Sequence, residues 1–172
     1  MAFHTVLSAS IQGLHVEMVH VEADVSNGLP VFHMVGYLSS EVKEASERVR
    51  TAIRNAGIQI PARKVVVNLA PATVRKKGAS FDLPIALAVM AALGEIEGEK
   101  LERTLVIGEL GLDGRVQEVP GILPMLLEAR KAGCRACILP IRNAPEGALV
   151  DGIRILGAVS YTHLRAHETC AD

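Results

Sequence analysis

The stretch KVVVNLAPATVRKKGASFDLPIALAVMAAL, residues 64–93, contains a strand, a basic loop and an apolar helix in direct succession. The β-branched run 65–67 favours a strand that is covered on both faces, and residues 68–71 are expected to turn the chain out of the sheet. The basic loop 75–78 then leads to the apolar run 83–93, which is too short to span a bilayer. We therefore expect this helix to lie in the core of an α/β domain.

The residues on either side of this stretch extend the α/β pattern. Alternation over residues 16–25 predicts a strand, and an apolar stripe over about 40–56 predicts a helix that ends at Gly57. Asp82 is expected to cap the helix that follows the basic loop. Further strands are expected at 31–35, 104–110, 115–119, 135–139 and 153–156, with an Asp-Gly hairpin turn at 113–114 and a helix from about 120 to 133.

The composition suits one domain and argues against some kinds of nucleic-acid binding. A chain of 172 residues with 49% hydrophobic content can bury one core. Aromatic residues make up 3% of the chain and Trp is absent, so few side chains could stack on unpaired bases. Residues 1–158 carry equal numbers of basic and acidic side chains, so no overall field attracts a polyanion, although local basic patches could still act.

The carboxyl-terminal residues do not read as natural protein. The stretch VSYTHLRAHET, residues 159–169, resembles the translation of a sequencing adapter, and we assign 159–172 to a non-native tail. His163 and His167 have the i, i+4 spacing of a metal site, with Glu168 and Cys170 nearby, but we reject that interpretation because of their origin. The natural chain is therefore expected to be truncated here and to have continued beyond residue 158.

The cysteines and the absence of targeting signals indicate a cytoplasmic protein. Cys134 and Cys137 form a Cys-x-x-Cys pair, but a structural zinc site needs four ligands and no second pair lies at matching spacing. We expect free thiols and no metal. No signal peptide and no run of 18 apolar residues occurs, so neither secretion nor a membrane is expected.

Several ordered motifs carry a family resemblance over roughly residues 5 to 158. They are SNGLP at 26–30, VG at 35–36, VKEA at 42–45, ERVR at 47–50, VNLAPA at 67–72, FDLPIA at 81–86, GEL at 108–110, LDG at 112–114 and PGILPM at 120–125. The chain resembles the amino-terminal, ChlI-like domain of the YifB/ComM family of magnesium-chelatase-like AAA+ proteins. It departs from the family pattern at 37–40, YLSS, where the family more often has Leu-Pro-Asp and a small residue.

The resemblance implies a fold and a role. The fold would be that of ribosomal protein S5 domain 2, shared with the Lon proteolytic domain: a mixed sheet packed with helices. Residues 1–158 would be a non-catalytic accessory domain of a hexameric motor that uses ATP and magnesium, acts on DNA and, in ComM-type members, promotes branch migration during natural transformation. Its partners would be its own AAA+ module, neighbouring subunits and DNA. No Gly-x-x-x-x-Gly-Lys-Ser/Thr motif occurs, so no cofactor is expected in this chain.

The likeness to Lon raises an alternative, a divergent or relict peptidase that uses Ser80. In Lon-like peptidases a serine before the long helix is activated by a lysine near the start of the helix after the hairpin. The resemblance puts Leu123 in the place of that lysine, and an aliphatic side chain cannot accept a proton. Ser80 is therefore a weak catalytic candidate. The simpler interpretation, which we favour, is that its hydroxyl caps a helix or lies in a loop.

A third hypothesis is a stand-alone nucleic-acid-binding module. Arg75, Lys76 and Lys77 could contact nucleic acid or a neighbouring subunit, or they could form an ordinary solvated loop. The same two interpretations apply to the basic residues of the helix at 40–56, which are Lys43, Arg48, Arg50 and Arg54. Salt-dependent DNA binding would distinguish this hypothesis from the accessory role.

Overall fold

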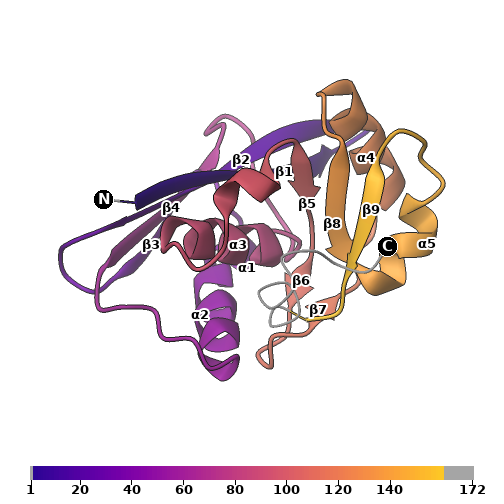
Figure 1. Cartoon of the computed structure of the whole chain (residues 1–172). Helices are drawn as coiled ribbons and strands as arrows, with labels where there is room; N and C mark the ends of the chain where they lie inside the picture. The colour runs from indigo at the N-terminus through magenta and orange to yellow at the C-terminus, as the bar shows by residue number, and fades with distance from the viewer. Residues whose placement is uncertain (1, 161–172) are drawn as a thin grey trace.

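One mixed sheet organises residues 2–160, the part of the chain that the computed structural model describes (Figure 1). Its seven strands lie in the order β3-β4-β2-β1-β5-β8-β9. The pairs β1–β2 and β2–β4 are antiparallel, and the pairs β3–β4, β1–β5, β5–β8 and β8–β9 are parallel. The strands are β1 (Ala2–Gln12), β2 (His15–Ser26), β3 (Phe32–Val35), β4 (Lys64–Ala70), β5 (Thr104–Val106), β8 (Ala136–Pro140) and β9 (Arg154–Ala158).

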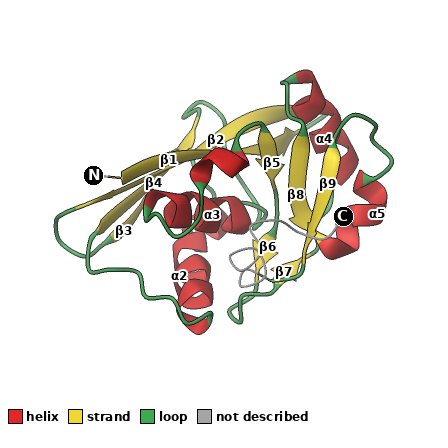
Figure 2. Ribbon diagram, viewed as in Figure 1, coloured by secondary structure: helices red, strands yellow, loops and turns green. Residues whose placement is uncertain are grey.

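Helices cover both faces of this sheet, which confirms the predicted fold class (Figure 2). They are α1 (Ser40–Lys43), α2 (Ala45–Asn55), α3 (Asp82–Ala92), α4 (Ile122–Lys131) and α5 (Ala144–Gly147), with short 3-10 turns η1 (Gly98–Leu101) and η2 (Ile141–Asn143). The larger core cluster joins α2 and α3 to one face of the sheet. A second cluster, which includes α4, lies on the other face, since adjacent residues of β5, Leu105 and Val106, belong to different clusters.

The apolar helix α3 lies in the core, as the sequence predicts. Ten of its eleven residues are buried, and it contacts β1, β2 and α2. A helix that is apolar all round must be surrounded by protein, because every face would otherwise expose hydrocarbon to water. No helix within residues 2–160 is long and apolar enough to cross a bilayer.

The first residue of α3 does not have the predicted capping role. Phe81 occupies the N-cap position, and its side chain makes no cap hydrogen bond. Asp82 is fully buried, and its carboxylate accepts hydrogen bonds from Arg48 Nε at 2.8 Å, Arg48 Nη2 at 3.0 Å and the Leu110 N–H at 3.1 Å. Burial raises the pKa of Asp82, and these hydrogen bonds act in the opposite direction. Asp82 therefore links α2, α3 and the hairpin strand that contains Leu110.

The predicted helix over 40–56 is interrupted at Glu44, which separates α1 from α2. In a continuous helix, the Glu41 carbonyl would accept a hydrogen bond from the backbone N–H four residues later. Here it accepts one from Arg48 Nη2 at 2.8 Å. The same guanidinium binds Asp82. The interruption thus coincides with a tertiary contact, whereas the apolar stripe of α2 is buried as expected.

Two strand boundaries also differ from the prediction. β4 continues to Ala70, because the pairing with β2 extends through Asn68–Glu22 to Ala70–His20. The Asn68 side chain also donates a hydrogen bond to the Glu22 carboxylate at 2.7 Å. The predicted strand 104–110 is divided between β5 and the separate hairpin of β6 (Glu109–Leu110) and β7 (Val116–Gln117). The division falls at Gly108, whose N–H donates to the Ser80 carbonyl and whose carbonyl accepts from the Leu83 N–H. The predicted hairpin turn is confirmed, with Gly114 at φ +87°.

Candidate functional site

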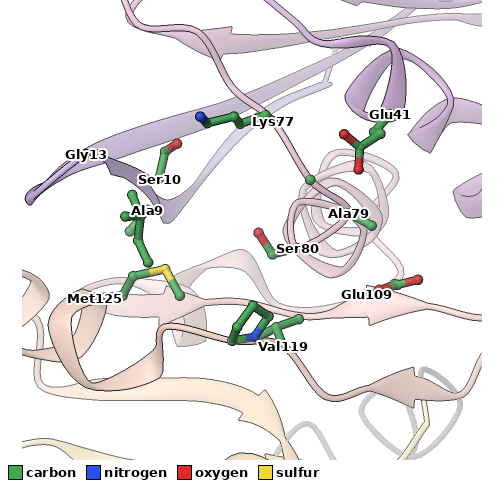
Figure 3. A pocket seen from close by; sticks show the side chains of 13 residues that line it. Ala9, Ser10, Gly13, Glu41, Lys77, Ala79, Ser80, Glu109, Val119 and Met125 are labelled. Atoms are coloured by element: carbon green, nitrogen blue, oxygen red, sulfur yellow. The ribbon is translucent and has the colours of Figure 1, made fainter.

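A cavity of about 580 Å³ lies beside the start of α3, between β1, the preceding loop and the start of α4 (Figure 3). We call it the Ser80 cavity. Its polar lining consists of Ser10, Glu41, Lys77, Ser80 and Glu109, and Met125 is among its apolar lining residues. These side chains come from β1, α1, the loop before α3, β6 and α4, so the cavity exists only in the folded domain.

The position of Ser80 follows from the loop that precedes α3. Gly78 adopts φ +85°, a left-handed conformation that glycine tolerates best, and the Ser80 carbonyl accepts the Gly108 N–H at 3.0 Å. The Ser80 side chain is half-buried and forms no hydrogen bond within residues 2–160. Because Phe81 is the N-cap, Ser80 is a loop hydroxyl, and the capping interpretation is wrong.

The neighbours of Ser80 include no base in hydrogen-bond contact with it among the described residues. In Figure 3 the Lys77 side chain extends toward Ser10 and away from Ser80. Met125 is the α4 side chain in the cavity lining, while Leu123 packs against the second core cluster. A serine hydroxyl without a neighbouring base is a weak nucleophile, so this arrangement can bind a ligand more readily than it can attack one.

Sequence reasoning did not find Ser10, Glu41 or Glu109. Ser10 is 5% exposed, and its Oγ accepts a hydrogen bond from Gln12 Nε2 at 2.8 Å. Ser8 is buried two residues earlier on the same strand and donates to the Val106 carbonyl at 2.8 Å. Two serines at alternate positions of an apolar strand were the available signal for Ser10. Glu109 stands in the GEL motif at 108–110, whereas Glu41 had no such signal, because it reaches the cavity from a separate element.

The basic loop is divided between solvent and core. Arg75 and Lys77 are exposed, whereas the Lys76 side chain is fully buried and its Nζ donates to the Pro71 carbonyl. The Lys76 backbone also bonds to Tyr37 and Ser39, with both N–O distances at 2.9 Å. Burial lowers the pKa of Lys76. Lys76 is therefore unavailable for surface contacts in this conformation, and the predicted three-residue patch is reduced to Arg75 and Lys77.

The basic residues of the first two helices also differ in their surroundings. Arg48 is bound to Asp82, and that hydrogen bond raises the pKa of Arg48. Lys43, Arg50 and Arg54 are exposed. Arg50 and Arg54 line a separate hollow of about 290 Å³, and none of these helix residues lines the Ser80 cavity. Arg48 therefore has a structural partner, whereas the other three remain candidates for contacts.

Cys134 and Cys137 are buried free thiols, as predicted. Burial raises the pKa of both thiols, which keeps them protonated and poorly reactive. Within residues 2–160 no three His, Cys, Asp or Glu side chains are grouped as metal ligands. His163, His167, Glu168 and Cys170 lie outside the described residues.

Comparison with known proteins gives a consistent family match. Residues 21–143 match the family described as "Subunit ChlI of Mg-chelatase". The chain is 39% identical over 166 residues to the uncharacterized protein YifB of Escherichia coli, a match that covers 96% of this chain and 32% of YifB. It is 39% identical over 151 residues to the competence protein ComM of Haemophilus influenzae, covering 88% of this chain and 30% of ComM.

A more distant relationship connects the chain to a protease. The Lon protease of Mycolicibacterium smegmatis is 28% identical over 145 residues, which cover 80% of this chain and 18% of Lon. This likeness agrees with the predicted fold. The chain spans about a third of the length of the YifB and ComM proteins that it matches.

Proposed function

The chain belongs to the ChlI family and is homologous to YifB and ComM, and from this premise we propose that residues 1–158 form a non-catalytic accessory domain of a DNA-associated AAA+ motor. The relatives are about three times as long as the matched region, which leaves room for a motor module outside this chain. That module would bind ATP and magnesium. This domain would contribute to assembly with neighbouring subunits of a hexamer or to engagement of DNA in the cytoplasm.

The observation that supports a non-catalytic role is the lining of the Ser80 cavity. Ser80 has no hydrogen-bonded base among the described residues, and Met125 is the α4 residue that faces the cavity. The chain also lacks a phosphate-binding loop with the Gly-x-x-x-x-Gly-Lys-Ser/Thr pattern, so its residues do not fit an ATP site of that kind. A domain that positions a motor needs neither a serine nucleophile nor an ATP site of its own.

The name of the H. influenzae relative, a competence protein, supports the finer proposal that the complete protein acts during natural transformation. We further propose that it acts there on DNA, through branch migration. The test is to replace the matching segment of ComM with residues 1–158 and to measure transformation frequency and DNA-stimulated ATP hydrolysis. We expect the chimera to keep both activities and a deletion of the segment to lose them. Full activity of the deleted protein would contradict an accessory role.

Ser80→Ala in the same chimera tests whether the domain is catalytic. We expect unchanged transformation and ATP hydrolysis, because the hydroxyl has no hydrogen-bond partner within residues 2–160 whose loss would disturb the fold. Loss of activity in a variant that melts at the wild-type temperature would instead support a reaction at Ser80.

The peptidase alternative rests on the unpartnered hydroxyl of Ser80 in a cavity. A fluorophosphonate probe that labels the wild-type chain but not Ser80→Ala would favour it.

The nucleic-acid alternative now rests on the exposed Arg75 and Lys77. Salt-dependent DNA binding that weakens in Arg75→Gln/Lys77→Gln would favour that alternative, and unchanged binding would remove these two residues from it.

A further inference from the structure

A second cavity, of about 570 Å³, lies where β5, β8 and β9 begin. We call it the arginine cavity, because Arg103, Arg135 and Arg154 line it, together with Lys100 and Glu102. The three strands are parallel neighbours, so their starts lie along one edge of the sheet (Figure 1). The Ser80 cavity includes Glu109, just beyond the other end of β5, and the two cavities share no lining residue.

Backbone hydrogen bonds bring the three arginines together. The Arg135 N–H donates to the Arg103 carbonyl at 2.8 Å, and the Arg154 N–H donates to the Arg135 carbonyl at 2.9 Å. Adjacent strands lie about 4.8 Å apart, so the three side chains start from positions that together span roughly 10 Å. Residues separated by 32 and 19 positions in the sequence thus become neighbours through strand pairing alone.

The charges of these arginines are not neutralised by the described part of the protein. All three are exposed, and their guanidinium groups form no ion pair or hydrogen bond within residues 2–160. Among the described residues that line the cavity, Glu102 is the single carboxylate, and Lys100 already pairs with Glu97 at 3.4 Å. Three like charges at this spacing repel one another, and an anion between them would relieve that repulsion.

Arg103 also has an unusual backbone conformation. Its φ is +53°, and it is the sole non-glycine residue with positive φ among the described residues. An L-residue in this region costs about 1 kcal/mol relative to glycine, which adopts it freely. The conformation aims the Arg103 carbonyl at the N–H groups of Arg135 and Ala136. Glycine would serve that backbone purpose, so an arginine here adds a cation to the cavity at a cost in stability.

We propose that the arginine cavity binds phosphate groups. The planar guanidinium fork matches two phosphate oxygens and stays protonated at all physiological pH values. None of the described residues that line the cavity is aromatic, so they offer no surface on which a base could stack. The ligand is therefore recognised through its phosphate, which belongs either to a small phosphorylated anion or to a nucleic-acid backbone. The proposal does not depend on the accessory role, because it rests on this cavity alone.

The first experiment follows backbone amide signals by NMR while inorganic phosphate is added to the ¹⁵N-labelled chain. We expect the largest shifts at Arg103, Thr104, Arg135, Ala136 and Arg154, and none at Ser80. Shifts spread evenly over the exposed basic residues, or an absence of shifts at this edge, would overturn the proposal. This measurement needs no substitution, so it cannot be confused with misfolding.

The second experiment compares the wild type with Arg103→Gln/Arg135→Gln/Arg154→Gln, using inorganic phosphate and a 20-base-pair duplex as probes. The control Arg63→Gln/Arg115→Gln/Arg142→Gln removes the same charge from exposed arginines outside the cavity. We expect phosphate affinity to fall at least about tenfold in the first variant and to change less than about twofold in the control. Equal affinities in the two variants would overturn the proposal.

The duplex distinguishes the two sources of phosphate. If the ligand is a nucleic-acid backbone, replacing the three arginines should reduce the slope of log affinity against log salt by roughly 2 to 3. If the ligand is a small anion, phosphate binding should weaken while duplex binding stays at the level of the control. Either result supports the cavity as a phosphate site, and neither depends on whether the domain assists a motor.

Discussion

The two cavities near opposite ends of β5 have almost the same volume, about 580 and 570 Å³, but they are built differently. The Ser80 cavity is lined from β1, α1, the loop before α3, β6 and α4, and the Arg48–Asp82 ion pair and Gly108 join neighbouring elements to the start of α3. The arginine cavity is formed by exposed side chains at strand ends. A buried charge requires a partner, whereas an exposed charge can remain unpaired until a ligand arrives. The comparison separates side chains that maintain the fold from side chains left available for binding.

The largest effect is expected at the ion pair that supports the Ser80 cavity. Asp82→Ala leaves the Arg48 guanidinium and the Leu110 N–H without their buried partner, so we expect unfolding free energy to fall by about 3–5 kcal/mol in urea titrations. Glu44→Ala, which removes the exposed carboxylate 3.8 Å from Arg48, should change it by less than about 1 kcal/mol. A loss below 1 kcal/mol for Asp82→Ala would remove the distinction between the two cavities.

A smaller, pH-dependent effect is expected at Lys76, beside the same cavity. Burial lowers the Lys76 pKa in the folded state, so the unfolded chain binds more protons between that lowered value and about 10.5. The contribution of Lys76 to stability therefore rises with pH through this window. The stability of the wild type relative to Lys76→Met should increase between pH 7 and 10 in urea titrations.

The exposed neighbour offers a matched control for that measurement. Lys77→Met removes an exposed lysine from the same loop, so it measures how the stability profile changes when one surface charge is lost. Identical pH profiles for Lys76→Met and Lys77→Met would mean that Lys76 is not buried in solution.

A substitution in the arginine cavity is expected to raise stability, not lower it. Arg103→Gly relieves the left-handed backbone strain, so we expect unfolding free energy to rise by about 0.5–1 kcal/mol while phosphate affinity falls. Calorimetric melting with and without phosphate measures both quantities. Arg154→Gly is the control, since Arg154 lies in a strand where glycine has no such advantage. A less stable Arg103→Gly variant would show that the side chain has a structural partner.

The smallest effect is expected at Ser80 itself. Ser80→Ala should change unfolding free energy by less than about 0.5 kcal/mol, because the half-buried hydroxyl has no hydrogen-bond partner in the described chain. Ser8→Ala is the contrasting variant. It removes a buried hydrogen bond to the Val106 carbonyl and should cost about 1–3 kcal/mol. Similar losses for the two variants would contradict this difference.

Helices and strands with a regular hydrophobic pattern were predictable from the sequence, whereas the points at which they break or end were not. The apolar face of α2, the apolar helix α3 and the alternating strand β2 follow from periodicity. The break at Glu44 and the extension of β4 to Ala70 involve hydrogen bonds to residues 34 to 46 positions away. Local pattern carries no information about such partners.

The candidate site shows the same division. Resemblance to a family led to Ser80, but Glu41 and Glu109 reach its cavity from elements far apart in the sequence. Arg103, Arg135 and Arg154 carry no shared motif and meet because β5, β8 and β9 pair in parallel. Their positions at or beside the starts of strands were predictable, whereas the order of those strands in the sheet was not.

By itself the sequence determined the family, the α/β class and the burial of α3, because ordered motifs and hydrophobic periodicity are properties of neighbouring residues. Only the tertiary structure decided which charges are paired. Lys76 and Lys77 are chemically identical neighbours, yet one is buried against a carbonyl and the other is exposed. Desolvation depends on residues distant in the chain, and it separates the buried lysine from the exposed one. Strand pairing likewise gathers at one edge three arginines that have no charged partner within residues 2–160.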